Sequence, residues 1–162
     1  MRQTLKIAAL ILASLILQIA LISRIPMFGG RPDLLLALVV SAALLRGPLY
    51  GGTVGFISGL LYDLFSADGR LGIQAFSRVV IGYGIGFIRG RLYSDNFITQ
   101  LASGFFATLA HKIITLAHLS LLRADTQFVS IRFTGLALAA ISNSILVVVV
   151  FWILKKLIKN EG

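Results

Sequence analysis

Glycine recurs at strict four-residue spacing along one apolar stretch, at Gly47, Gly51, Gly55 and Gly59, and Asp63 takes the next place in the series. Four residues turn an α-helix by about 400°, so these positions form one stripe on its surface. In water a glycine stripe destabilises a helix, because glycine loses more conformational entropy on folding than alanine does. In a lipid bilayer it lets two backbones approach closely, and van der Waals packing between them favours association. The stripe predicts helices packed against each other within a membrane.

The composition agrees with this class of protein. Of the 162 residues, 57% are hydrophobic and only 13% are charged, whereas soluble domains contain about 25% charged residues. The chain has no cysteine, which excludes disulfides, thiolate nucleophiles and zinc–cysteine sites. The formal net charge is +9, but the cations lie in short connections and at the termini rather than in one basic patch. Nucleic acid is therefore not an expected partner.

Six apolar segments follow one another, separated by connections of about ten residues or fewer. They span residues 5–23, 33–45, 48–65, 71–88, 97–122 and 131–154. A helix that crosses a bilayer needs about 17–25 residues. The second segment is shorter, so it is tilted, extended by its flanks or re-entrant, and the choice between five and six spans stays open. We expect residues 1–162 to form one all-α integral membrane domain, a compact bundle of about six transmembrane helices.

The distribution of lysine and arginine predicts the orientation of this bundle, because cytoplasmic connections carry an excess of these residues. If the N-terminus is cytoplasmic, that side holds the larger group of cations, namely Arg2, Lys6, Arg46, Arg89, Arg91, Lys155, Lys156 and Lys159. The outer side then holds Arg24, Arg31, Arg70, Arg123 and Arg132, and acids that include Asp33, Asp68 and Asp125. Trp152 fits an anchor at the inner interface. We expect a multi-pass protein of the cytoplasmic (inner) membrane with both termini in the cytoplasm.

Small and polar residues mark the inward-facing sides of the predicted helices. In the fifth segment, spacings of 4, 3, 4 and 3 place five residues on one seam: Gly104, Thr108, His111, Thr115 and His118. In the fourth segment Gly82 and Gly86 repeat the four-residue glycine spacing. The first segment carries Gln18, and the sixth carries Asn143 between two serines. We expect these faces to pack inward. The expected helix-packing residues are Gly47, Gly51, Gly55, Gly59, Gly82 and Gly86.

Ionisable residues inside the apolar segments predict a polar network. Arg78 and Lys112 are the two cations deep in spans, and Asp63 is the acid well inside one. An unpaired charge near hydrocarbon is costly, so we expect Asp63 to pair with Arg78 and Lys112 to extend toward the interface. The alternative is an outward-facing polar cavity that holds an anionic ligand. His111 and His118 have no acid or cysteine beside them on their helix, which favours interhelical hydrogen bonds over a metal site or a proton relay.

No pattern in the chain points to catalysis. Paired carboxylates and the HExxH, GxSxG and P-loop motifs are all missing from the sequence. The stretch Gly82–Gly86 contains GxG, but it lies inside an apolar segment with no preceding strand, so it does not indicate a dinucleotide site. We expect no enzyme activity, no cofactor and no metal.

The second to fourth segments resemble the MreD family, polytopic membrane proteins of the bacterial rod-shape system. The resemblance is carried by Arg31–Leu36, Leu44–Pro48, Gly51, Gly55, Phe56, Gly59–Asp63, Leu71, Gly72, Ala75, Gly82, Tyr83 and Arg89–Leu92. Within it, the positions that match the family pattern most characteristically are Pro32, Asp33, Arg46, Gly47, Pro48, Asp63, Gly72 and Tyr83. Order and spacing together make the match specific over more than a third of the chain.

The resemblance implies a role and partners. It implies a component of the cell-elongation (rod) complex that binds MreC, a single-span protein with a large periplasmic domain. The wider complex holds the MreB filament, the RodA glycosyltransferase and its transpeptidase partner, so the chain would help couple the cytoskeleton to peptidoglycan synthesis and cell shape. The MreD family also resembles the S components of energy-coupling-factor transporters in helical arrangement. The alternative function is therefore a small solute-binding membrane subunit of such a transporter.

Overall fold

The computed structural model describes residues 2–20, 32–65, 72–121 and 133–159. Within these ranges each predicted segment contains one α-helix: α1 (Arg2–Ala20), α2 (Leu34–Arg46), α3 (Pro48–Phe65), α4 (Ile73–Ile88), α5 (Phe97–Leu121) and α6 (Phe133–Lys159). A short 3-10 helix, η2 (Arg89–Arg91), follows α4. The expected all-α class is confirmed for these residues. The ends of the predicted segments at residues 21–23, 71, 122 and 131–132 lie outside the described residues. Arg31, Asp68 and Asp125 also lie outside them.

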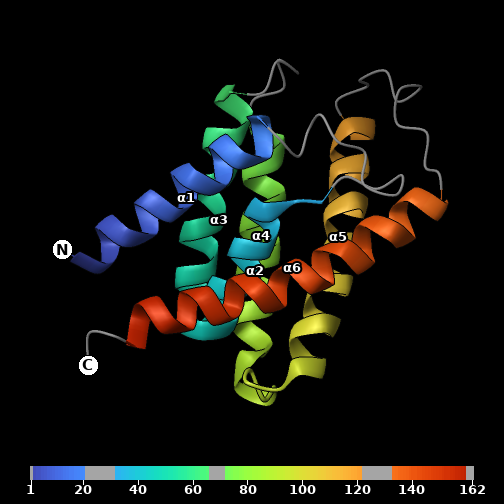
Figure 1. The fold of residues 1–162 in the computed structure, drawn as a ribbon. Helices are drawn as coiled ribbons and strands as arrows, with labels where there is room; N and C mark the ends of the chain where they lie inside the picture. The colour runs from blue at the N-terminus through green and yellow to red at the C-terminus, as the bar shows by residue number, and fades with distance from the viewer. Residues whose placement is uncertain (1, 21–31, 66–71, 122–132, 160–162) are drawn as a thin grey trace.

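The short helix α2 is the centre of the bundle. It contacts each of the other five α-helices, and every residue from Leu35 to Leu44 is buried. An apolar surface all round suits this position, because every side of the helix meets another helix. Its 13 residues give a length of about 20 Å, less than the roughly 30 Å of a hydrocarbon layer. In Figure 1, α3 rises past the start of α2.

Local sequence determines both ends of α2. Asp33 is the N-cap, with an extended backbone and a side chain that accepts a hydrogen bond from the Leu36 N–H. At the other end Gly47 has a φ of 90° and donates its N–H to the Ala43 carbonyl; a glycine adopts this φ without strain. Pro48 then begins α3, at the position where a missing N–H is tolerated. A single non-helical residue therefore connects α2 to α3.

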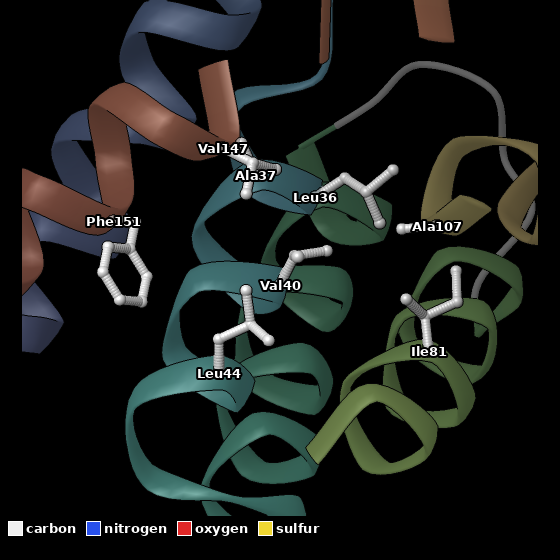
Figure 2. Packing of buried hydrophobic residues seen from close by; sticks show 8 residues of the cluster. All are labelled: Leu36, Ala37, Val40, Leu44, Ile81, Ala107, Val147 and Phe151. Atoms are coloured by element: carbon white, nitrogen blue, oxygen red, sulfur yellow. The ribbon is translucent and has the colours of Figure 1, made fainter. Parts of the chain in front are cut away.

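The hydrophobic core surrounds α2. On one side the cluster in Figure 2 joins α2 to α4, α5 and α6 through Leu36, Ala37, Val40, Leu44, Ile81, Ala107, Val147 and Phe151. A second cluster joins α2 to α1, α3 and α6 through Leu38, Val39, Ala42, Ile11, Val54 and Leu154. Because α2 contributes to both clusters, it is the element through which the other helices are held together.

The outer surface of the described bundle is largely apolar. Exposed large side chains occur on α3, α4 and α5, for example Leu49, Phe87, Ile98, Phe106 and Ile113. Contiguous apolar exteriors of this kind belong to proteins that meet lipid or partners. Of the described helices, two are long and apolar enough to cross a membrane, over Phe97–His118 and Gly135–Ile158. The full set of six spans stays a prediction.

Two elements meet at the end of the bundle that carries the α4–α5 connection, opposite the end of α3 (Figure 1). Lys155 of α6 pairs with Asp95 of this connection, with Nζ 2.6 Å from Oδ1. The same Nζ lies 5.2 Å from the centre of the Trp152 ring, which is half exposed. An exposed indole beside a lysine is typical of a membrane interface.

Candidate functional site

The glycine stripe of α3 lies against α4. A Cβ built on Gly55 would be 2.5 Å from the carbonyl oxygen of Arg78, and one on Gly51 would be 2.5 Å from that of Gly82. Both neighbours are backbone atoms, which cannot rotate away as a side chain can. The two helices therefore cross backbone to backbone, and residues with a Cβ would force them apart.

The crossing continues at both ends of the stripe. A Cβ on Gly59 would meet the backbone of Ala75, and one on Gly86 of α4 would meet the backbone of Pro48. Gly47 differs, because the nearest atom to its Cβ position is a side-chain nitrogen of Arg89 at 3.7 Å. Gly47 was expected to be a helix-packing residue, but it serves the turn between α2 and α3, whereas Gly51, Gly55, Gly59 and Gly86 serve close packing.

The N-terminus of α2 lies in a polar cluster inside the bundle. The Asp33 N–H donates to Asn143 Oδ1 of α6 at 2.7 Å, and the Leu34 N–H donates to Gln18 Oε1 of α1 at 2.9 Å. Gln18 also donates from Nε2 to the carbonyl of the buried Pro32 at 3.0 Å. The first N–H groups of a helix have no partner within the helix. Here side chains from two other helices and the Asp33 cap supply the acceptors.

The partner of Arg78 is Asp33. Nη2 of Arg78 lies 2.9 Å from Oδ2 of Asp33, and the arginine is 1% exposed. The guanidinium also lies over the Tyr62 ring, 4.9 Å from its centre. The expected pair of Asp63 with Arg78 is therefore wrong. Asp33 was expected at the outer surface, but α2 is short and begins inside the bundle, which brings its N-cap within reach of α4.

Asp63 instead caps α4 from a distance. Its carboxylate accepts hydrogen bonds from the backbone N–H groups of Gly72 at 2.9 Å, Gln74 at 3.3 Å and Ala75 at 3.1 Å. Gly72 occupies the N-cap with a φ of 93° and has no side chain to cap the helix. A carboxylate from α3 fills that role and interacts favourably with the positive end of the α4 dipole. This is why the buried acid does not need a cation.

The predicted seam of α5 contacts α4 and α6. His111 Nε2 lies 2.8 Å from Gln74 Oε1, and the Thr115 hydroxyl lies 3.4 Å from that of Ser77. His118 packs against Phe76, with ring centres 5.7 Å apart. On the α6 side, Asn143 Nδ2 donates to Thr108 Oγ1 at 3.1 Å, and a Cβ on Gly104 would be 2.7 Å from Ser144 Cα. The expectation of interhelical hydrogen bonding is confirmed for His111.

The remaining predicted residues lie apart from this cluster. Lys112 is partly exposed, and it forms no ion pair with any of the described residues. Arg46 lies over the Tyr50 ring at 5.0 Å, near the α2–α3 turn. Tyr83 is half exposed on α4. Nowhere in the described ranges do three His, Cys, Asp or Glu side chains gather as a metal site would require.

Two nitrogen atoms of Arg78 lack a hydrogen-bond partner in the described part of the chain. These atoms, Nε and Nη1, are both buried. The sequence marks Asn143 and Gln18 only as polar residues within apolar segments, and it does not indicate that they bind the start of α2. Asp33 directly before an apolar run is the clearer signal, because aspartate is a preferred N-cap residue.

The fold and the cluster define a class: an all-α protein with many exposed apolar side chains, whose buried polar groups mainly join its helices. The family model for "rod shape-determining protein MreD" matches residues 1–157. The chain therefore belongs to the MreD family. Neither the comparison with curated proteins nor the comparison with solved structures gave a match.

Proposed function

We propose that this chain is a non-catalytic membrane component of the cell-elongation complex and that it binds MreC there. The match to the MreD family over residues 1–157 is the observation that carries the proposal. Through MreC it would work alongside MreB, RodA and the transpeptidase partner of RodA, and so help couple the cytoskeleton to peptidoglycan synthesis.

The polar contacts of the bundle support a scaffold. Asp33, Gln18 and Asn143 are used to hold the start of α2, and Asp63 is used to cap α4. The contacts of Gln18 and Asn143 join α1 and α6 to the start of α2, and the contact of Asp63 joins α3 to α4. A scaffold benefits from such contacts because they define one arrangement of helices that partners can recognise.

The face available to a partner span lies on the outside of the α3–α4 crossing. The main glycine stripe is occupied by α4, but Gly52 lies one residue along and is partly exposed beside Tyr83. A Cβ on Gly52 would be 3.8 Å from the Tyr83 Cβ, an ordinary contact. Phe56 is exposed on the same face of α3, one turn further along. Small and aromatic residues side by side suit the packing of a single transmembrane helix.

Co-purification tests the proposal. The tagged chain and MreC are co-expressed, solubilised in mild detergent and captured, and we expect MreC in the eluate. Gly52→Leu on α3 should lower the amount of captured MreC without lowering the melting temperature. Gly84→Leu, on a different face of α4 from Tyr83, should leave the amount of captured MreC unchanged. Failure to capture MreC under conditions where the folded chain is recovered would contradict the proposal.

Orientation is tested separately. Cysteines at Ser66 and Glu161, both outside the described residues, are probed on intact cells with an impermeant thiol reagent. We expect labelling at Ser66 and protection at Glu161, as both termini in the cytoplasm require. Labelling at Glu161, or protection at Ser66 in a strain lacking the partners, would indicate an inverted or five-span arrangement.

One observation favours the solute-binding alternative: two buried nitrogens of Arg78 have no hydrogen-bond partner in the described ranges. A buried guanidinium with free N–H groups is a site at which a small anion could bind. Co-purification with an ATPase module in place of MreC, lost in Arg78→Gln, would favour that alternative.

A further inference from the structure

An apolar groove runs between α4 and α5 on the outside of the bundle. Its volume is about 520 Å³, and residues along it include Val80, Gly84 and Ile88 of α4 and Ala102, Phe106 and Ala110 of α5. Its lining includes the small residues Gly84 and Ala102, the buried Ile81 and Ala107, and the exposed Phe106. A volume of this size is within the range of roughly 300–1,000 Å³ typical of small-molecule sites.

The groove is shorter than the full thickness of a bilayer's hydrocarbon layer. Its α4 side extends from Val80 to Ile88 and its α5 side from Ile98 to Ile114. At 1.5 Å per residue these distances are about 12 Å and about 24 Å. The α4 side is close to half of a hydrocarbon layer of about 30 Å, and the α5 side is shorter than the whole layer. A lipid acyl chain fits such a length, whereas a spanning helix would need a seam along the full thickness.

A cation lies at one end of the groove. Ile88 and Leu92 both line it, and between them the 3-10 helix η2 carries Arg89 and Arg91. Arg89 points toward the α2–α3 turn, where its Nη1 lies 3.7 Å from the Cβ position of Gly47. Arg91 is exposed, and among the described residues no carboxylate pairs with it. An apolar channel that ends at an exposed guanidinium is complementary to an anionic amphiphile.

We propose that the α4–α5 groove binds one anionic phospholipid, with an acyl chain between the two helices and the headgroup phosphate at Arg91. The acyl chain of the lipid displaces no side chain, because the groove is already formed. The phosphate accepts charge-assisted hydrogen bonds from Arg91, so anionic headgroups are preferred over zwitterionic ones. This site is separate from the polar cluster at Asp33 and from the Gly52 face, and it does not depend on MreC.

Gly84 offers a direct way to block the groove. A Cβ on Gly84 would meet no atom within 4 Å, so Gly84→Leu fills the groove without disturbing the fold. The purified full chain, in detergent micelles that contain phosphatidylglycerol or phosphatidylethanolamine with the same acyl chains, is analysed by native mass spectrometry. We expect one phosphatidylglycerol retained by the native chain and the retained fraction lowered about tenfold or more in Gly84→Leu. Gly52→Leu, matched in size but on another face, should retain the lipid.

Arg91 tests the headgroup. Arg91→Gln should reduce the preference for phosphatidylglycerol over phosphatidylethanolamine by about fivefold, since one cation near anionic lipid contributes roughly that factor. Lys156→Gln, also an exposed cation, removes the same charge and should leave the preference unchanged. The melting temperature of each variant shows that it is folded.

Three results would overturn the proposal. One is equal retention of both lipids by the native chain, and another is retention of phosphatidylglycerol by folded Gly84→Leu. The third comes from a photo-crosslinking residue at Ala102 in cells, because labelling of a protein span instead of lipid would assign the groove to a helix. None of these results bears on MreC capture, so the proposed function is judged independently.

Discussion

The α3–α4 crossing and the start of α2 hold helices together by opposite means. At the crossing, Gly51 and Gly55 bring backbones into contact with no polar side chain involved. At the start of α2, side chains from α1, α4 and α6 converge on Asp33 and its neighbour Leu34 through hydrogen bonds. The α3–α4 crossing requires positions without side chains, and the start of α2 requires side chains with particular hydrogen-bonding groups. The crossing should therefore be sensitive to the size of a substituent and the α2 start to its chemistry.

The largest effect is expected at the crossing. Gly55→Leu places a Cβ 2.5 Å from a backbone oxygen, so the helices must separate; overpacking a well-packed core costs about 1–3 kcal/mol and occasionally more. We expect little folded protein in detergent extracts, measured by size-exclusion yield and melting temperature. Leu60→Gly on the exposed side of α3 is the control and should cost about 1 kcal/mol. Equal yields for the two variants would place the stripe against lipid instead.

The next effect is expected at the α2 start. Arg78→Met leaves the backbone at the crossing intact but removes the cation from Asp33, which should cost about 3 kcal/mol. Asp33→Asn keeps an N-cap oxygen and loses the charge. A double-mutant cycle between the two, measured by denaturant unfolding, should give a coupling of about 1–3 kcal/mol. Strict additivity would mean that the two side chains act separately.

A smaller effect is expected when a neutral hydrogen-bond acceptor is removed from the start of α2. Asn143→Ala removes the acceptor of the Asp33 N–H, and leaving such a group unpaired costs about 1–3 kcal/mol. Ser142→Ala is the matched control, because the Ser142 hydroxyl donates to the Leu138 carbonyl of its own helix and has no other partner in the described part of the chain. Hydrogen exchange at the first turn of α2 should become faster in Asn143→Ala. Unchanged exchange would show that α6 does not support this turn.

The smallest pair of effects concerns the two other acids with assigned partners. Asp63→Asn loses one of the oxygens that cap α4 and should cost about 1 kcal/mol. Asp95→Asn, at the 68% exposed side of the ion pair with Lys155, should change stability by less, since exposed pairs contribute about 0–1 kcal/mol. Thermal unfolding of both variants in the same detergent gives the order. A larger loss in Asp95→Asn would mean that α6 depends on this pair.

The helices and the packing faces could be predicted from the sequence, because both follow from local periodicity. The glycine stripe and the α5 seam needed only residue spacing to be recognised as inward faces. The pairing of Arg78 could not be predicted in this way. Asp33 and Asp63 are both acids at the end of an apolar segment, and only the depth at which α2 starts decides which of them reaches α4. That depth depends on packing against five helices at once, which no local pattern encodes.

The short central helix has a consequence for how the protein is made. Asp33 and Arg78 are 45 positions apart, and at ribosomal rates of roughly 5–20 residues per second the arginine follows the acid by about 2–9 seconds. During that interval α2, too short to span alone, has neither its cation nor the later helices that surround it. We expect it to stay at the translocon or at the bilayer surface until the fourth helix arrives. A nascent chain arrested before Arg78 should therefore leave α2 accessible to an aqueous probe, and one arrested after α6 should not.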